Sequence, residues 1–178
     1  MALELIEATG DVQLELLARG EVDAGFVLHS PGFTAPGLAQ ALIASEPLVV
    51  ALPESHPLAA EERPALKSLL AEPLVIFPRR ILPSLFDAIF GLYNAAGRVP
   101  QVSQEAIQMQ TIVNLVSAGL GMAWVPQSVR QFQRPGVVYR AVGWPRGRAV
   151  PACETSLVWR SGAVSPALAH FISFAKAQ

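Results

Sequence analysis

Short apolar runs of strand length alternate with segments of helical spacing through most of this 178-residue chain. Residues 3–7 alternate in the way of a strand, and residues 11–18 have a helical spacing that ends before Gly20. Residues 22–28 then form an apolar run typical of a strand buried on both faces. We expect these three segments to form a β–α–β unit with parallel strands and a right-handed crossover, which indicates an α/β fold.

The rest of the chain continues this alternation. Apolar runs predict strands at residues 38–44, 47–52, 74–77, 99–103, 121–125, 137–142 and 155–159. Apolar stripes predict a short helix near residues 65–70 and longer helices from Pro83, through 109–116 and from Pro166. Gly119 suits a left-handed helix end, and Ser165 suits a helix N-cap. The order of elements predicts two lobes, the first made of residues 1–45 and 143–178 and the second of residues 46–142.

The charge balance indicates that this chain does not bind nucleic acid strongly by itself. The formal net charge is −1, only 15% of residues are charged, and the nearest approach to a basic cluster is Arg140, Arg146 and Arg148. Cys153 is the one cysteine, so an internal disulfide and a cysteine-rich metal site are both excluded. The three histidines lie far apart without ligand spacing. We expect neither a metal ion nor another cofactor.

The longest uncharged stretch, residues 106–129, is the part of the chain to test as a membrane span. It carries polar amides and is interrupted by Gly119, Gly121 and Pro126, so a helix, a glycine turn and a buried strand are expected instead. The N-terminal residues are acidic where a signal peptide needs bases. Together with the free thiol of Cys153, this pattern predicts a cytoplasmic protein without a membrane contact.

Four blocks of sequence together resemble the effector-binding domain of LysR-type transcription regulators. The blocks are GEVDAGFV at 20–27, EPLVVALPESHPLA at 46–59, QEAIQMQTIVNLVSAGLGMAWVP at 104–126 and PGVVYRAV at 135–142. They occur in the order and spacing of the family across nearly the whole chain. The resemblance is closest to the branch that responds to aromatic acids, muconates and chlorocatechol products.

This resemblance implies a type II periplasmic-binding-protein-like fold, in which two α/β lobes are joined by two crossover segments and hold the ligand between them. It further implies that the chain senses a small organic acid, aromatic or muconate-like, within a homodimer or tetramer that bends promoter DNA. Such a regulator contacts DNA through a winged helix-turn-helix, which this chain does not contain. The sequence LELIEATGDVQ matches the second strand and second helix of the family's sensor domain, so the first strand and helix are expected to be missing. A strand lost from a sheet exposes its neighbours' edges, and we therefore expect this chain to dimerise, aggregate or borrow a strand.

Three expected helix starts are the candidate positions for the effector, because free N–H groups and the positive end of the helix dipole favour small anions. In open α/β sheets such starts gather beyond the carboxyl ends of the strands. The first start contains Thr9 and Gly10, where the resemblance implies an effector contact and Gly10 stands in the place of a family threonine. An ordinary helix cap by Thr9 or Asp11 explains this start equally well.

The second and third starts carry similar alternatives. Pro83, Ser84 and Leu85 match family pocket positions, and Ser84 could donate to a carboxylate, but Pro83 could also simply begin a helix. Gln108 and Met109 resemble family positions at the mouth of the cleft, although a methionine on an apolar stripe is usually core filler.

Two further groups have ordinary explanations. Arg79 and Arg80 follow an expected strand on the cleft side and could pair with a ligand carboxylate, but for either one alone a solvated loop charge is the better interpretation. Cys153 has no histidine or other base near it in the sequence, so a nucleophilic role is not expected.

Three classes of function remain to be weighed. A regulatory sensor needs a binding cleft and no catalytic group, which agrees with this sequence. An enzyme is not expected, because the chain has no G-x-S-x-G motif, metal-ligand cluster or phosphate loop. The alternative is a solute-binding receptor of the same fold with no regulatory role, which would need a secretory signal or a lipid-attachment cysteine at its N-terminus.

Overall fold

The computed structural model of this chain describes residues 3–131, 133–147, 151–162 and 164–177. Its helices are α1 (Gly10–Arg19), α2 (Leu66–Leu69), α3 (Pro83–Asn94), α4 (Met109–Ser117) and α5 (Pro166–Lys176), with two 3-10 turns, η1 (Pro57–Ala60) and η2 (Gln127–Gln131). Its strands are β1 (Ala24–His29), β2 (Leu38–Pro53), β3 (Leu74–Ile76), β4 (Val102–Glu105), β5 (Ala123–Pro126), β6 (Val137–Arg140) and β7 (Ala152–Arg160). The fold is therefore mixed α/β, as the alternation in the sequence predicts.

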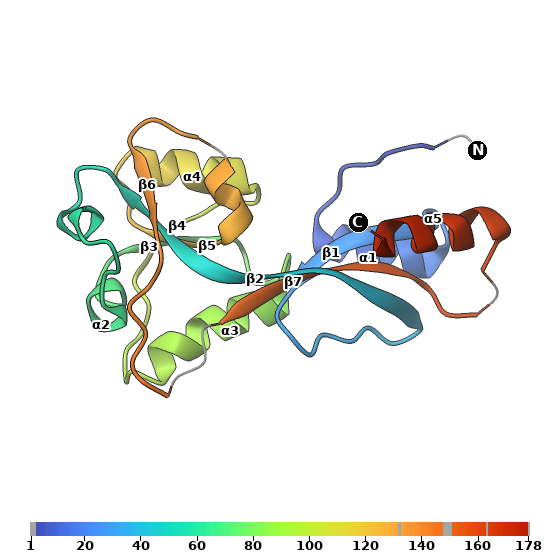
Figure 1. The fold of residues 1–178 in the computed structure, drawn as a ribbon, viewed down its shortest axis with the longest axis horizontal. Coiled ribbons are helices and arrows are strands. Elements are labelled where there is room, and N and C mark those ends of the chain that lie inside the picture. The colour runs from blue at the N-terminus through green and yellow to red at the C-terminus, as the bar shows by residue number, and fades with distance from the viewer. Residues whose placement is uncertain (1–2, 132, 148–150, 163, 178) are drawn as a thin grey trace.

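Two long strands, β2 and β7, run side by side through the middle of the molecule (Figure 1). At one end they carry α1, β1 and α5, and at the other end they carry β3 to β6 with α2 and α4 (Figure 1). The main sheet has the strand order β1-β7-β2-β5, with β6 also paired to β2. All these pairs are antiparallel, whereas β3 and β4 form a separate parallel pair.

The sequence predicts two strands at 38–44 and 47–52, and this expectation is wrong because β2 is one continuous strand of 16 residues. Its pairing with β7 shifts register between Leu42 and Ala44 and then continues to Pro47, which lies opposite Ala152. A bulge of this kind absorbs one extra residue without ending the strand. Ser45 and Glu46, the two residues between the expected strands, thus pair with Glu154 and Cys153 of β7.

The N-terminal segment also differs from the prediction. Residues 3–9 are irregular rather than a strand, with Leu5 85% exposed and Leu3 62% exposed. The expected parallel β–α–β unit is therefore not formed, and β1 pairs antiparallel with β7 instead. An alternating pattern specifies which side chains a strand would bury, but a strand also needs a neighbour to complete its backbone hydrogen bonds.

Local signals at helix ends are confirmed. Gly20 and Gly119 adopt positive φ angles of 72° and 81°, where they end α1 and follow α4. Ser165 accepts a hydrogen bond from the backbone N–H of Leu168 and so caps α5. The uncharged stretch at 106–129 contains α4, a glycine turn and β5, as expected. Across the described ranges, none of the helices combines the length and the apolar character that crossing a membrane requires.

The buried side chains form one large cluster and two small ones. The large cluster surrounds the second half of β2 with β3, β5, α3 and α4. The small clusters join β7 to α5 and β7 to α1, the latter through Leu17, Val27 and Val158. Because β2 and β7 contribute to clusters at both ends, they tie the two groups of elements together.

Candidate functional site

A cavity of about 570 Å³ lies where the start of α1, strand β1, the loop after β3 and the start of α4 meet. Nine apolar residues form most of its wall: Ala8, Phe26, Leu28, Phe77, Ile81, Leu82, Ile107, Met109 and Ile112. The remaining lining residues are Glu7, Thr9, Gly10, Gln13, Gln108 and Gln110. A concave, mainly apolar site with a few polar groups is the usual form of a small-molecule site.

Four of the seven residues predicted for the site line this cavity. Thr9 and Gly10 come from the start of α1, and Gln108 and Met109 come from the start of α4, a separation of about a hundred residues in the chain. Met109 is half-buried, and it packs on the large hydrophobic cluster as well as lining the cavity.

The other three predicted residues, Pro83, Ser84 and Leu85, are not among those that line the cavity. Leu85 is 1% exposed within the large cluster, and Pro83 is exposed. Ser84 accepts a hydrogen bond on its Oγ from the backbone N–H of Ser30, at 3.2 Å. The residues just before them, Ile81 and Leu82, reach the cavity in their place.

Several lining residues were not predicted, and their signal in the sequence is weak. Phe77 ends an expected strand, and Glu7 and Ile107 stand beside two of the predicted helix starts. These residues stand at the end of a strand or the start of a helix, which is where a ligand site is expected. That position does not predict which of the neighbouring side chains line the cavity.

Neither helix start that reaches the cavity is capped by its own N-cap side chain. Thr9 precedes α1 and Gln108 precedes α4, and neither side chain accepts a hydrogen bond from the first turn. The Thr9 hydroxyl donates instead to the carboxylate of Asp11. This hydrogen bond, aided by backbone N–H donors and by Arg80, lowers the pKa of Asp11 below its ordinary value.

Two side-chain pairs cross the space between the two groups of elements near the cavity. Nη1 of Arg80 lies 3.5 Å from Oδ2 of Asp11, and Nε2 of Gln108 donates to Oε1 of Glu7 at 3.4 Å. Arg79 faces elsewhere, since its guanidinium contacts both carboxylate oxygens of Asp87 at 2.7 and 2.8 Å. Both arginine side chains are exposed, at 62% for Arg79 and 63% for Arg80, and each lies beside an acid of the protein.

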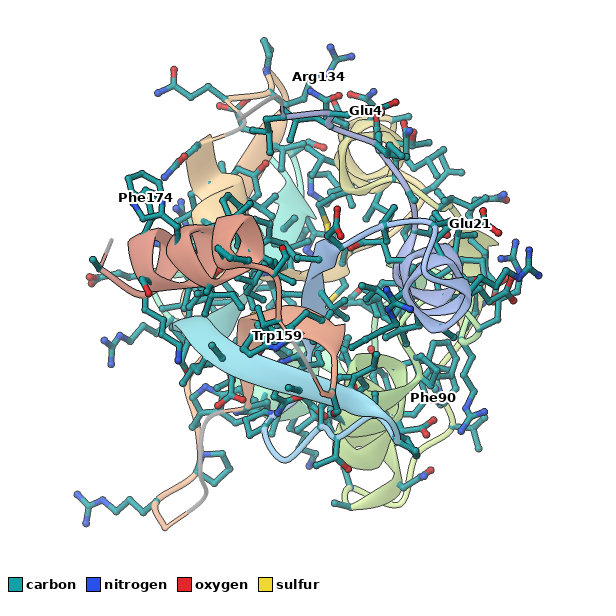
Figure 2. The ribbon with its side chains drawn as sticks, turned by 90° about the vertical axis from the view of Figure 1, so that its right-hand side faces the viewer. Glu4, Glu21, Phe90, Arg134, Trp159 and Phe174 are labelled. Carbon is teal, nitrogen blue, oxygen red and sulfur yellow. The ribbon has the colours of Figure 1, made fainter. Side chains whose placement is uncertain are left out.

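A second cavity, of about 720 Å³, lies between residues 3–8, β1 and α5. Apolar side chains such as Phe26 and Phe171 line it together with four acids, Glu4, Glu7, Glu21 and Asp23. Figure 2 views the molecule from this end and shows Phe174 on α5 pointing outward, with 59% of its surface exposed. This cavity borders the edge of β1 that does not pair with β7.

The buried reactive groups lie away from both cavities. Nε2 of His29 is 2.9 Å from the Ser156 hydroxyl, and its other ring nitrogen contacts the carbonyl of Ser30. Both His29 and Ser156 are 1% exposed, so this serine–histidine pair is packed where a substrate has no access. Burial raises the pKa of the Cys153 thiol to about 12, which keeps it protonated. Within the part of the chain that the structure describes, no three histidine, cysteine or acidic side chains are grouped as metal ligands.

Comparison with known proteins places the whole chain in one family. The family model of the LysR substrate binding domain matches residues 1–178. The HTH-type transcriptional regulator IlvR of Caulobacter vibrioides is 43% identical over 167 residues, which are 93% of this chain and 54% of the relative. AlsR of Bacillus subtilis, another HTH-type transcriptional regulator, is 33% identical over 177 residues, which are 99% of this chain and 56% of the relative. The chain thus spans about half the length of these relatives.

Solved structures of regulators share the fold. CbnR, a LysR family transcriptional regulator, superposes with a TM-score of 0.78 at 27% identity, covering 98% of this chain and 58% of CbnR. The BenM effector binding domain with its effector benzoate superposes with a TM-score of 0.75 at 25% identity, covering 98% of this chain and 77% of that domain.

Proposed function

The chain belongs to the LysR substrate-binding-domain family, and from this premise we propose that the 570 Å³ cavity binds the small organic acid that a bacterial transcription regulator senses. The architecture is that of the effector-binding domains among its structural neighbours, which are periplasmic-binding-protein-like. In this proposal residues 1–45 and 143–178 form the first lobe, residues 46–142 form the second, and the cavity is the cleft between them.

One observation carries the proposal: the starts of α1 and α4, from opposite ends of the molecule, open onto the same largely apolar cavity. Each start presents backbone N–H groups and the positive end of a helix dipole. The first turn of α4 is not capped by Gln108, so its donors suit a ligand carboxylate. The apolar wall suits the carbon skeleton of the same ligand.

Within this class we propose an aromatic or muconate-like acid as the effector. Support comes from the BenM domain, whose structure contains benzoate, and from the aromatic side chains Phe26 and Phe77 in the cavity wall. Of these, an aromatic acid with one carboxylate fits better than a dicarboxylate such as muconate, because the described lining residues include no arginine or lysine to balance a further negative charge.

Sensing requires that the bound and free states differ. We propose that the effector binds one lobe arrangement more tightly and that an oligomer of the longer protein transmits the difference to DNA. The relatives are HTH-type regulators about twice as long as the matched region, which supports a homodimer or tetramer that binds DNA through a winged helix-turn-helix outside this chain. Such a protein acts in the bacterial cytoplasm, and it binds its effector without transforming it.

A solute-binding receptor of the same fold is the second candidate, and the names of the curated relatives favour the regulator over it. The genomic DNA upstream of Met1 separates the two. A sensor is expected to be preceded in frame by a helix-turn-helix, and a secretory signal there would instead support the receptor.

A thermal-shift series tests effector binding. Benzoate, cis,cis-muconate and catechol-derived acids are added to the chain, and a ligand at about 100 times its Kd should stabilise the folded state by about 2.7 kcal/mol. For a chain of this size that corresponds to an increase in Tm of roughly 5–10 °C. Ile107→Asp, which places a charge in the cavity wall, should abolish the increase, whereas Val99→Asp should retain it, since Val99 is 89% exposed outside the cavity. A shift that survives Ile107→Asp would place the ligand elsewhere.

A further inference from the structure

Glu7 is the only charged side chain among the described residues that line the 570 Å³ cavity. Its Oε1 accepts the 3.4 Å hydrogen bond from Nε2 of Gln108, and Gln108 is the N-cap residue of α4. A carboxylate of the protein therefore stands directly beside the helix start that is proposed to hold the carboxylate of the ligand.

Two carboxylates that share one cavity repel each other unless a positive charge lies between them. The protein does not supply this charge from the lining. Arg80 is outside the lining residues, and its guanidinium faces Asp11 at 3.5 Å. A simple carboxylic acid bound at α4 would thus bring a second negative charge next to Glu7 without compensation.

We infer that the effector carries its own positive group, and that the cavity takes an α-amino acid with an apolar side chain. This inference rests on the proposed function, because it assigns the carboxylate of the ligand to the helix start. The ammonium group contacts Glu7, and the carboxylate accepts N–H groups from the first turn of α4. Gln108 links Glu7 to the start of α4. An α-amino acid likewise carries its ammonium and carboxylate groups on the same carbon atom.

The remaining wall fits the side chain of such a ligand. Phe26 and Leu28 on β1 and Phe77 after β3 line the same cavity, and Phe77 is 2% exposed. An aromatic or branched aliphatic side chain would remove its apolar surface from water against these residues. Apart from Gln108, which contacts Glu7, a polar side chain would find amides only at Gln13 and Gln110 among the described lining residues.

Isothermal titration of matched ligand sets tests this inference. One set is L-phenylalanine, 3-phenylpropanoate and 2-phenylethylamine, and the other is L-leucine, 4-methylpentanoate and 3-methylbutylamine. Each compound is titrated into the unaltered chain, into Glu7→Gln and into Glu4→Gln. Glu4 lies in the same exposed segment but lines only the larger cavity, so it controls for the loss of one negative charge.

We expect at least one amino acid to bind about tenfold more tightly than its deaminated acid and its amine. Glu7→Gln should weaken the binding of that amino acid by about tenfold and should leave the affinity for the deaminated acid unchanged or higher. Glu4→Gln should change neither affinity. If the deaminated acid binds at least as tightly, or Glu7→Gln spares the amino acid, the amino-acid assignment is wrong while the acid-binding cavity stands. If neither these acids nor the aromatic acids of the thermal-shift series bind at all, the proposed function fails with it.

Discussion

Gly10 and Ile81 approach so closely that a β-carbon on Gly10 would stand 2.9 Å from the carbonyl oxygen of Ile81. The same β-carbon would lie 3.3 Å from a methyl carbon of Leu82. The start of α1 thus packs directly against the loop between β3 and α3, and the lack of a side chain at Gly10 permits this contact. Beside this contact, Ile81 and Leu82 line the cavity, whereas Pro83, Ser84 and Leu85 do not.

Gly10→Ala is therefore expected to destabilise the chain by about 1–3 kcal/mol, because the backbone oxygen of Ile81 cannot move aside as a flexible side chain would. Gly91→Ala is the matched control, since Gly91 also lies in a helix but has open space around its β-position. The control should gain about 0.5–1 kcal/mol from the better helix propensity of alanine. Urea denaturation measures both, and equal stability of the two variants would contradict the close contact.

The carboxyl group of Asp11 should titrate below its ordinary pKa of 3.8, mainly because the Thr9 hydroxyl donates to it. Thr9→Val should raise this pKa more than Arg80→Gln does, since the hydrogen bond outweighs the charge of the exposed arginine. NMR titration of the side-chain carboxyl carbon measures the three values. A larger effect of Arg80→Gln would reverse the order of causes.

The sign of the linked stability follows from the lowered pKa. A carboxyl whose pKa is lower in the folded state stabilises the protein above its unfolded pKa, and this contribution disappears as the pH falls through the folded pKa. Asp11→Asn should therefore be less stable than the unaltered chain at pH 7, by no more than about 1 kcal/mol for a partly exposed group. The difference should shrink as the pH falls and vanish below the folded pKa, as a series of denaturation curves from pH 7 downward would show.

Cys153 should not react with thiol reagents while the chain is folded. Its side chain is fully buried, and burial raises its pKa to about 12, so the reactive thiolate is scarce at pH 8. Labelling with iodoacetamide should be slow in buffer and complete in urea. Fast labelling of the folded chain would mean that the strands β2 and β7 open at this point.

The free edge of β1 and the exposed residues 3–7 should cause the chain to associate. Leu5 is 85% exposed and Phe26 is 47% exposed on this surface, which borders the larger cavity. Light scattering should therefore detect dimers or aggregates at micromolar concentration. The variant Phe26→Lys should shift the chain toward monomer, and Val99→Lys, on another exposed surface, should not. A stable monomer of the unaltered chain would contradict this prediction.

The sequence alone was enough to predict the helix ends and the family of this protein. The ends of α1 and α5 follow from Gly20 and Ser165, since a left-handed glycine and a capping hydroxyl act within one turn of the chain. The ordered blocks of sequence identified the family, and through it the architecture, because they record a whole fold rather than one element.

Long-range pairing decided the rest. Residues 3–7 have a strand pattern without a partner strand, and β2 continues through an apparent break because β7 accompanies it. In the same way, Thr9 and Gln108 reach one cavity while Ser84 faces Ser30, although all three stand at helix starts. Side-chain patterns determine local conformation. Whether two helix starts lie at the same cavity depends instead on contacts between residues far apart in the chain, and these contacts exist only in the folded sheet.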